Sequence, residues 1–149
     1  MREILFRAKR KDNGKWVEGY YVPHIVGGKI VHHYILTGEA SLEETKDDSL
    51  VLDFYREEIA PETLCQYTGL TDKNGRKIWE NDILDIGEKT KLRVSWHTFK
   101  ASWVVSKSGW MFNHFFGESI EPEDVEVVGN VFDNPELLEI SDWKVSAEP

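Results

Sequence analysis

The first part of the chain alternates apolar and polar side chains with the two-residue period of an extended strand. Ile4, Phe6 and Ala8 occupy every second position, and residues 16–22 form a run rich in β-branched and aromatic residues. An Asn-Gly turn at 13–14 separates these runs, and a Gly-Gly pair precedes a third run at 29–36. The pattern predicts an antiparallel meander of three strands.

Residues 37–49 interrupt the alternation. Leu42 is their one large apolar residue, and it stands among acidic side chains. We therefore expect an acidic loop at 37–49. Ser41 and Glu44 also have the spacing of a helix capping box, which leaves an exposed helix as an alternative. A strand-like apolar run resumes at 50–54.

The second half repeats short apolar runs between turn residues, and a last alternating run covers 125–131. Asn134, Pro135 and Glu136 then have the types preferred at a helix start, so we expect a short helix that ends near residue 140. About ten short strands in all predict an all-β fold with minor helix. The short, strongly bent strands of the second half suit a small SH3-like barrel.

Two small antiparallel β modules follow from this pattern. We expect residues 1–60 to form the meander with its acidic loop, and residues 61–140 to form the small barrel. Residues 141–149 are expected to be a frayed tail.

Composition excludes several classes of protein. The 149 residues are 40% hydrophobic, which excludes global disorder, and the single Cys65 excludes an intrachain disulfide framework. Apolar runs are far shorter than the ~18 residues that span a bilayer, and no secretory signal is recognisable. These features indicate a soluble, cytoplasmic protein.

The net charge of −9 is unevenly distributed. Acidic residues concentrate at 39–58 and 118–149, and the remainder is mildly basic. Nucleic acid is a conceivable partner of the second module but is not favoured, because the whole chain repels a duplex at long range. The candidate nucleic-acid contacts are Lys73, Arg76, Lys77, Lys89, Lys91 and Arg93.

No pattern of catalytic or metal-binding residues is found. His32 and His33 are adjacent in a strand and therefore point to opposite faces, and no activating base lies near Cys65 in the sequence. Asp82 and Asp85 also fall on opposite faces of a strand, so they do not form a carboxylate pair. We predict no catalytic residue, no metal and no cofactor, and hence no enzyme.

Aromatic residues crowd the segment 79–116. Trp96 and Trp103 occupy alternating positions and are expected in the core. The segment around residues 110–116 holds more apolar side chains than one strand face can bury, which suggests an interface with a partner. The candidate interface residues are Trp110, Met111, Phe112, Phe115 and Phe116.

Residues 66–83 read QYTGLTDKNGRKIWENDI. They resemble the signature of the YopX family, roughly QYTGLKDKNGKEIYEGDI. The start of the chain, with ILFRA and WVEGY, and its end, VGNVFDNPELL, also resemble that family, so the likeness runs nearly from end to end. Asn81 replaces the family's Gly and Trp79 its Tyr. Asn tolerates the left-handed backbone, so we expect the turn to be kept.

The resemblance implies a small phage or prophage protein that is all-β in two parts and assembles into oligomers. It implies no biochemical activity and therefore no catalytic residue. The matching motif residues have structural interpretations: turns for Gly69, Asn74 and Gly75, packing for Tyr67 and Trp79, and capping for Asp82.

The leading hypothesis is a phage or prophage accessory protein of the host cytoplasm. It would act by binding, as a self-associating β module without catalytic activity, and a host or phage protein is a further conceivable partner. Two alternatives are a nucleic-acid-binding small barrel and an acidic protein that binds a host factor.

Overall fold

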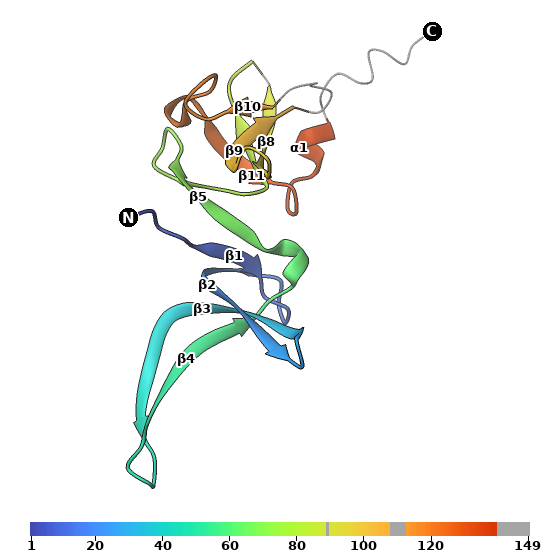
Figure 1. The fold of residues 1–149 in the computed structure, drawn as a ribbon. Helices are drawn as coiled ribbons and strands as arrows, with labels where there is room; N and C mark the ends of the chain where they lie inside the picture. Colours follow the sequence, from blue (N-terminus) through green and yellow to red (C-terminus); the bar gives the residue numbers. More distant parts are fainter. Residues whose placement is uncertain (89, 108–112, 140–149) are drawn as a thin grey trace. The chain divides into compact units, whose positions relative to one another are not determined.

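The computed structural model describes residues 1–88, 90–107 and 113–139. The chain divides into two compact units, Met1–Gln66 and Tyr67–Pro149, which are called unit 1 and unit 2 below. The sequence analysis placed the division at residue 60. Both units consist mainly of antiparallel strands (Figure 1), so the all-β class is confirmed.

Unit 1 contains β1 (Phe6–Lys9), β2 (Trp16–Val26), β3 (Lys29–Glu44), β4 (Leu50–Glu58) and the start of β5 (Cys65–Thr71). The strands lie in the order β4-β3-β2-β1-β5, and every neighbouring pair is antiparallel. The expected three-stranded meander is confirmed as β1 to β3. A short 3₁₀ helix, Pro61–Thr63, leads into β5.

The expected acidic loop at 37–49 is wrong over most of its length. β3 continues to Glu44, and its last residues pair with β4 alone, so β3 and β4 form a two-stranded ribbon (Figure 1). A turn between Thr45 and Ser49 closes the ribbon, with the Thr45 N–H 2.8 Å from the Ser49 carbonyl oxygen. Hydroxyl hydrogen bonds from Ser49 and Thr45 lower the pKa of Asp47 to about 2 in this turn. The helix alternative at Ser41 is wrong for the same reason.

The core of unit 1 is small. Ala8, Ile35 and Ile59 are fully buried, and a few partly buried side chains such as Phe6 and Tyr21 pack around them. Gly19 permits the close approach of β2 and β3, because a Cβ atom there would lie 1.9 Å from the carbonyl oxygen of Leu36. Unit 1 therefore depends on tight backbone contact as much as on buried side chains.

Unit 2 contains the rest of β5 and six further strands: β6 (Lys77–Trp79), β7 (Asp82–Asp85), β8 (Lys91–His97), β9 (Ser102–Ser106), β10 (His114–Phe115) and β11 (Glu126–Asn130). β6 pairs with β5, and the others form a sheet in the order β10-β9-β8-β7-β11. In the described part of the chain this sheet ends at β10 and β11, so the SH3-like closure stays a prediction.

A larger core holds unit 2 together. Its fully or nearly fully buried members come from five strands and one loop: Ile78, Leu84, Leu92, Val94, Trp103, Val105, Val125 and Val127. The expected short helix is confirmed as α1 (Glu136–Glu139), and a 3₁₀ turn, Pro122–Asp124, precedes β11. The Asn134 side chain accepts a hydrogen bond from the Asn130 N–H at 3.3 Å, and so ties the start of α1 to β11.

Candidate functional site

The 66–83 motif forms the framework of unit 2. The rings of Tyr67 and Trp79 lie 5.4 Å apart, and both side chains are buried. Gly69 and Gly75 have left-handed backbones, with φ of 86° and 76°. Asn74 lies in the turn between β5 and β6, where its N–H donates to an Asp72 carboxylate oxygen at 2.9 Å. Each of these residues has a role in the local fold.

Asp72 joins the turn between β5 and β6 to β11, a role that was not predicted from the sequence. One carboxylate oxygen accepts from the N–H groups of Asn74 and Arg76, and the other from the N–H of Val127, each at 2.9 Å. Burial alone would raise its pKa, but these three bonds and the Arg76 charge outweigh it, so the pKa lies below its ordinary value. Its position at the start of an Asn-Gly turn was the available signal.

Asp82 and Asn81 fix the next turn. The Asp82 carboxylate is buried and accepts from the Trp79 N–H at 2.8 Å. Asn81 has φ of 66°, as the Gly of the family pattern would allow, and its side-chain oxygen accepts from Arg93 at 2.7 Å. The motif is therefore a scaffold, in which the carboxylates of Asp72 and Asp82 accept hydrogen bonds from backbone N–H groups.

The candidate nucleic-acid contacts do not form one free basic surface. Lys73 pairs with Glu126 at 3.0 Å, and Lys91 pairs with Asp85 and lowers the pKa of that carboxyl group. Arg76 reaches the Val127 carbonyl oxygen at 3.4 Å, and Lys77 lies 5.9 Å from the ring centroid of Tyr67. Arg93 is bound to Asn81, and Lys89 lies outside the described residues.

Three of the candidate interface residues, Trp110, Met111 and Phe112, lie outside the described residues. Phe115 is on β10, with its ring 6.3 Å from that of His97. Phe116 is partly buried and packs against the core of unit 2.

The expectation for Trp96 is wrong. Its side chain is 42% exposed, whereas Trp103 is buried as expected. Trp96 and Trp103 lie opposite each other on the same face of the sheet, and their rings meet edge to face at 5.0 Å. Trp96 is the second-last residue of β8, and at this end of the strand its side chain stays exposed. Phe99, in the following turn, is 97% exposed.

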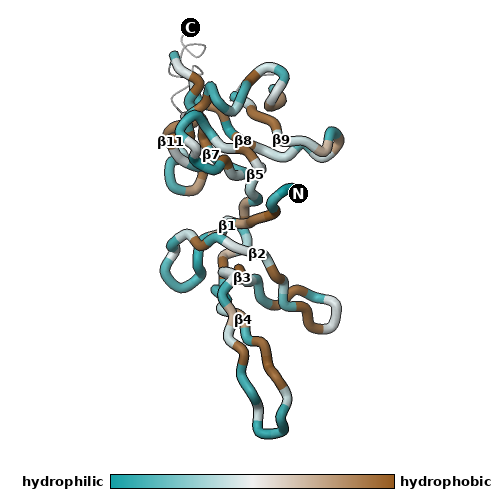
Figure 2. The backbone as a smooth tube through the Cα atoms, turned by 90° about the vertical axis from the view of Figure 1, so that its left-hand side faces the viewer, coloured by the Kyte–Doolittle hydropathy of each residue, from teal (hydrophilic) through white to brown (hydrophobic). Residues whose placement is uncertain are grey.

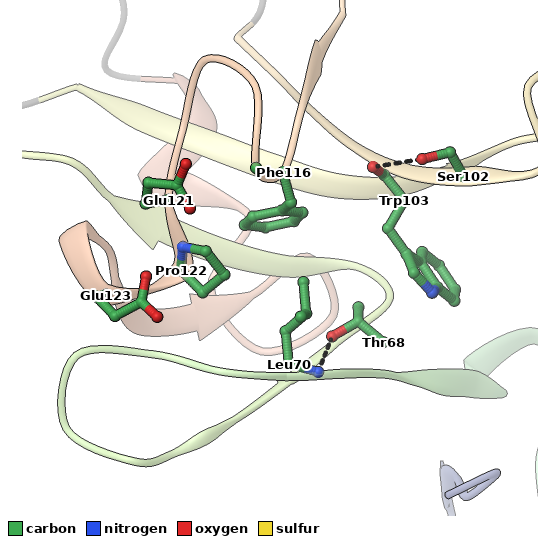
Figure 3. Close-up of a pocket in the computed structure, with 9 residues that line it drawn as sticks. Thr68, Leu70, Ser102, Trp103, Phe116, Glu121, Pro122 and Glu123 are labelled. Carbon is green, nitrogen blue, oxygen red and sulfur yellow. Dashed lines mark hydrogen bonds between the residues drawn. The ribbon is translucent and has the colours of Figure 1, made fainter. Parts of the chain in front are cut away.

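A groove of about 450 Å³ opens on unit 2 (Figure 3). It is called the unit 2 groove below. Figure 3 shows Phe116 and Leu70 between Trp103 at one end and Glu121, Pro122 and Glu123 at the other. Thr68, Ser102 and Gly117 complete the lining.

A second, smaller hollow of about 320 Å³ in unit 1 is lined by Lys11, Asp12, Glu57 and Glu58. Its charged lining residues are paired: Arg10 bridges Asp12 and Glu57, and Lys11 and His32 both contact Glu58. The hydrogen bonds from His32 and Lys11 lower the pKa of Glu58. These pairs tie the β1–β2 turn to the end of β4.

Metal-ligating residues do not converge in the described ranges, where no group of three or more His, Cys, Asp or Glu is placed to hold an ion. His24 and His32 stack across β2 and β3 with ring centroids 5.6 Å apart, and His33 contacts the Tyr21 hydroxyl at 2.7 Å. Cys65 is buried, and its Sγ donates to the Thr63 carbonyl oxygen at 3.3 Å.

The β3–β4 ribbon presents a continuous apolar face. In an antiparallel pair, residues directly opposite each other share a face. Leu42 lies opposite Leu52, Ala40 opposite Phe54, and Glu44 opposite Leu50. The other face carries the pairs Ser41–Asp53 and Glu43–Val51. The apolar residues of the first face are called the arm face below. They are Ala40, Leu42, Leu50, Leu52 and Phe54.

The described part of the chain leaves the arm face uncovered. Leu42, Leu50 and Leu52 are 63%, 66% and 55% exposed. Figure 2 shows hydrophobic stretches on both strands of this ribbon, ending at a hydrophilic tip. The strand-like apolar run at 50–54 was visible in the sequence, but its pairing with residues 40–44 was not.

Together, the two antiparallel units, the backbone-bound carboxylates of Asp72 and Asp82 and the exposed arm face describe an all-β protein. Among the described residues, no helix is both long and apolar enough to cross a membrane. The family model "YopX protein" matches residues 5–139, and the chain belongs to that family.

A solved structure has a similar fold: the crystal structure of protein EF1440 from Enterococcus faecalis. It is 20% identical to this chain and superposes with a TM-score of 0.57, covering 93% of this chain and 99% of its own. At this identity the likeness concerns the fold alone. A search of curated proteins finds no match.

Proposed function

We propose that this YopX-family chain is a non-catalytic accessory protein of a phage or prophage, active in the host cytoplasm, that associates with copies of itself through the arm face. The observation that carries the proposal is the exposure of Leu42, Leu50 and Leu52 on one side of a two-stranded ribbon. The accessory role and the location rest on the family resemblance.

An isolated two-stranded ribbon is marginal in water, and contiguous exposed apolar patches mark interaction surfaces. Covering each large side chain of the arm face contributes up to about 1.5–3 kcal/mol. Two arm faces together supply enough such side chains to offset an association cost of about 4–15 kcal/mol.

A second copy suits this face because its central pairs, Ala40–Phe54 and Leu42–Leu52, are apolar. Glu43 and Asp53 lie on the opposite side of the ribbon, whereas Glu44 lies on the same side as the leucines, at the end next to the turn. Two arm faces can therefore pack against each other around a two-fold axis with Glu43 and Asp53 in water and Glu44 at the edge of the contact.

The absence of catalysis is supported by how the buried carboxylates are used. Asp72 and Asp82 both accept backbone N–H groups, so neither is available as a general base. The pairing of Lys73 and Lys91 with carboxylates makes nucleic acid the less favoured partner.

Sedimentation velocity over a concentration series tests the proposal. Wild type should sediment as an oligomer, and Leu52→Ser should raise the dissociation constant at least tenfold. Val51→Ser is the matched control, because Val51 is 47% exposed on the opposite face of the same ribbon. A wild type that stays monomeric at high concentration, or an equal effect of both substitutions, would contradict the proposal.

A further inference from the structure

We propose that the unit 2 groove binds an arginine-bearing peptide segment of another protein. This goes beyond self-association, because the groove lies in unit 2 and shares no residue with the arm face. The proposal rests on the apolar walls of the groove and on the charge at one of its ends.

The walls are preformed. Trp103 belongs to the buried core, and Leu70 and Phe116 are partly buried side chains packed against that core. They come from β5, β9 and the segment after β10, so the fold of unit 2 sets their spacing. Rigid apolar surfaces of this kind bind without a large ordering cost.

Several hydrogen-bonding groups in the groove are already engaged. The Thr68 hydroxyl donates to the Ile78 carbonyl oxygen at 2.7 Å and accepts from the Leu70 N–H at 3.1 Å. The Gly117 N–H donates to the Ile120 carbonyl oxygen at 3.0 Å. The charged groups of the groove lining that a ligand could contact are the carboxylates of Glu121 and Glu123.

Within the described part of the chain, no cationic side chain pairs with Glu121 or Glu123. Both glutamates are exposed at the same end of the groove (Figure 3). Charge complementarity therefore calls for a cationic ligand, and it disfavours the phosphates of a nucleic acid.

Arginine meets both demands of the groove. Its planar guanidinium forms paired hydrogen bonds with carboxylates and stacks on aromatic rings such as Phe116. A volume of about 450 Å³ is larger than one guanidinium needs, which leaves room for apolar side chains beside it. A peptide with leucine next to arginine supplies both parts.

The test uses the full-length protein, labelled with ¹⁵N, and the probe peptide acetyl-Leu-Arg-Leu-Arg-amide. We expect saturable amide shifts at residues 68–70, 102–103 and 116–123. Acetyl-Leu-Glu-Leu-Glu-amide should cause none, and acetyl-Gly-Arg-Gly-Arg-amide should bind at least fivefold more weakly because it lacks the apolar contacts.

Substitutions then separate the groove from general charge attraction. The double variant Glu121→Gln/Glu123→Gln should weaken binding of the Leu-Arg peptide at least tenfold. Glu118→Gln is the matched control, since Glu118 is an exposed carboxylate nearby that does not line the groove. All three positions are exposed, so the amide spectrum should keep its folded dispersion.

Three results would overturn the proposal. One is the absence of saturable shifts at millimolar peptide, and another is an equal loss of affinity in the Glu118→Gln control. The third is tighter binding of spermidine than of the Leu-Arg peptide at the same residues, which would assign the groove to small polycations instead.

Discussion

The two units use their apolar residues in opposite ways. Among the described residues, unit 2 gathers eight of them into a buried cluster, whereas the buried cluster of unit 1 has three. Within the same ranges, most of the large exposed hydrophobic side chains belong to unit 1, including the leucines of the arm face. The same β architecture therefore differs in how it places apolar residues: unit 2 buries them in its own core, and unit 1 leaves many of them exposed, which is the basis of the proposed self-association.

The sharpest way to break this contrast is to remove the same side chain from each unit. Leu84→Ala deletes a fully buried side chain at the centre of unit 2 and should lower the free energy of unfolding by about 2–5 kcal/mol. Leu52→Ala, in the exposed arm face, should lower the free energy of unfolding of the dissociated monomer far less. Hydrogen exchange read separately for each unit measures both effects, and equal losses would refute the contrast.

The next largest effect should come from Asp72, which joins the β5–β6 turn to β11. Asp72→Ala leaves three backbone N–H groups without their acceptor and should destabilise unit 2 by about 1.5–3 kcal/mol. Asp124→Ala, at an exposed aspartate of the same unit, is the control. In denaturant titrations, Asp72→Ala should lower the stability of unit 2, and Asp124→Ala should leave it unchanged.

The same carboxylate gives unit 2 a defined sensitivity to acid. The folded pKa of Asp72 lies below its unfolded value, so its contribution to stability is complete above the unfolded pKa of about 3.9. That contribution is lost as the pH falls through the lower folded pKa. In denaturant titrations between pH 5 and pH 2, wild-type unit 2 should lose more stability than the Asp72→Ala variant does.

A smaller effect, confined to unit 1, is expected from Gly19→Ala. The added Cβ would lie 1.9 Å from the Leu36 carbonyl oxygen, so β2 and β3 must separate, at a cost of about 1–3 kcal/mol. Amide exchange in β2 and β3 should accelerate while the amides of β7 and β8 keep their protection. Acceleration in both units would show that they are energetically coupled.

The sequence predicted elements wherever a local pattern or a turn residue determined them. The first three strands, the short helix and the turns around Gly69 and Gly75 have such signals. The end of β3 had none, because Glu43 and Glu44 are held in a strand by pairing with β4 and not by burial. Trp96 lies on the same face of β8 as the buried Leu92 and Val94, but periodicity does not show how far along the strand that face is covered by other side chains.

The unit 2 groove was beyond sequence reasoning for a different reason. Leu70, Trp103, Phe116 and Glu121 lie on separate elements, and no fixed spacing links them. Their convergence depends on the order of strands in the sheet. The arm face is an intermediate case. Its β4 half was predicted from an apolar run, but the β3 residues opposite that run follow only from the strand register.

The pairing of β1 with β5 has a consequence for how the chain folds. Arg7 lies opposite Cys65, so unit 1 closes only after the intervening strands have been synthesised and drawn together. The β2–β3 and β3–β4 hairpins join neighbouring segments and should form first, because local contacts form faster than distant ones. Nascent copies would then display the arm face before β1 has found its last partner. Folding of unit 1 and encounter with a second copy would share one intermediate, and their rates would respond together to the concentration of newly made chains.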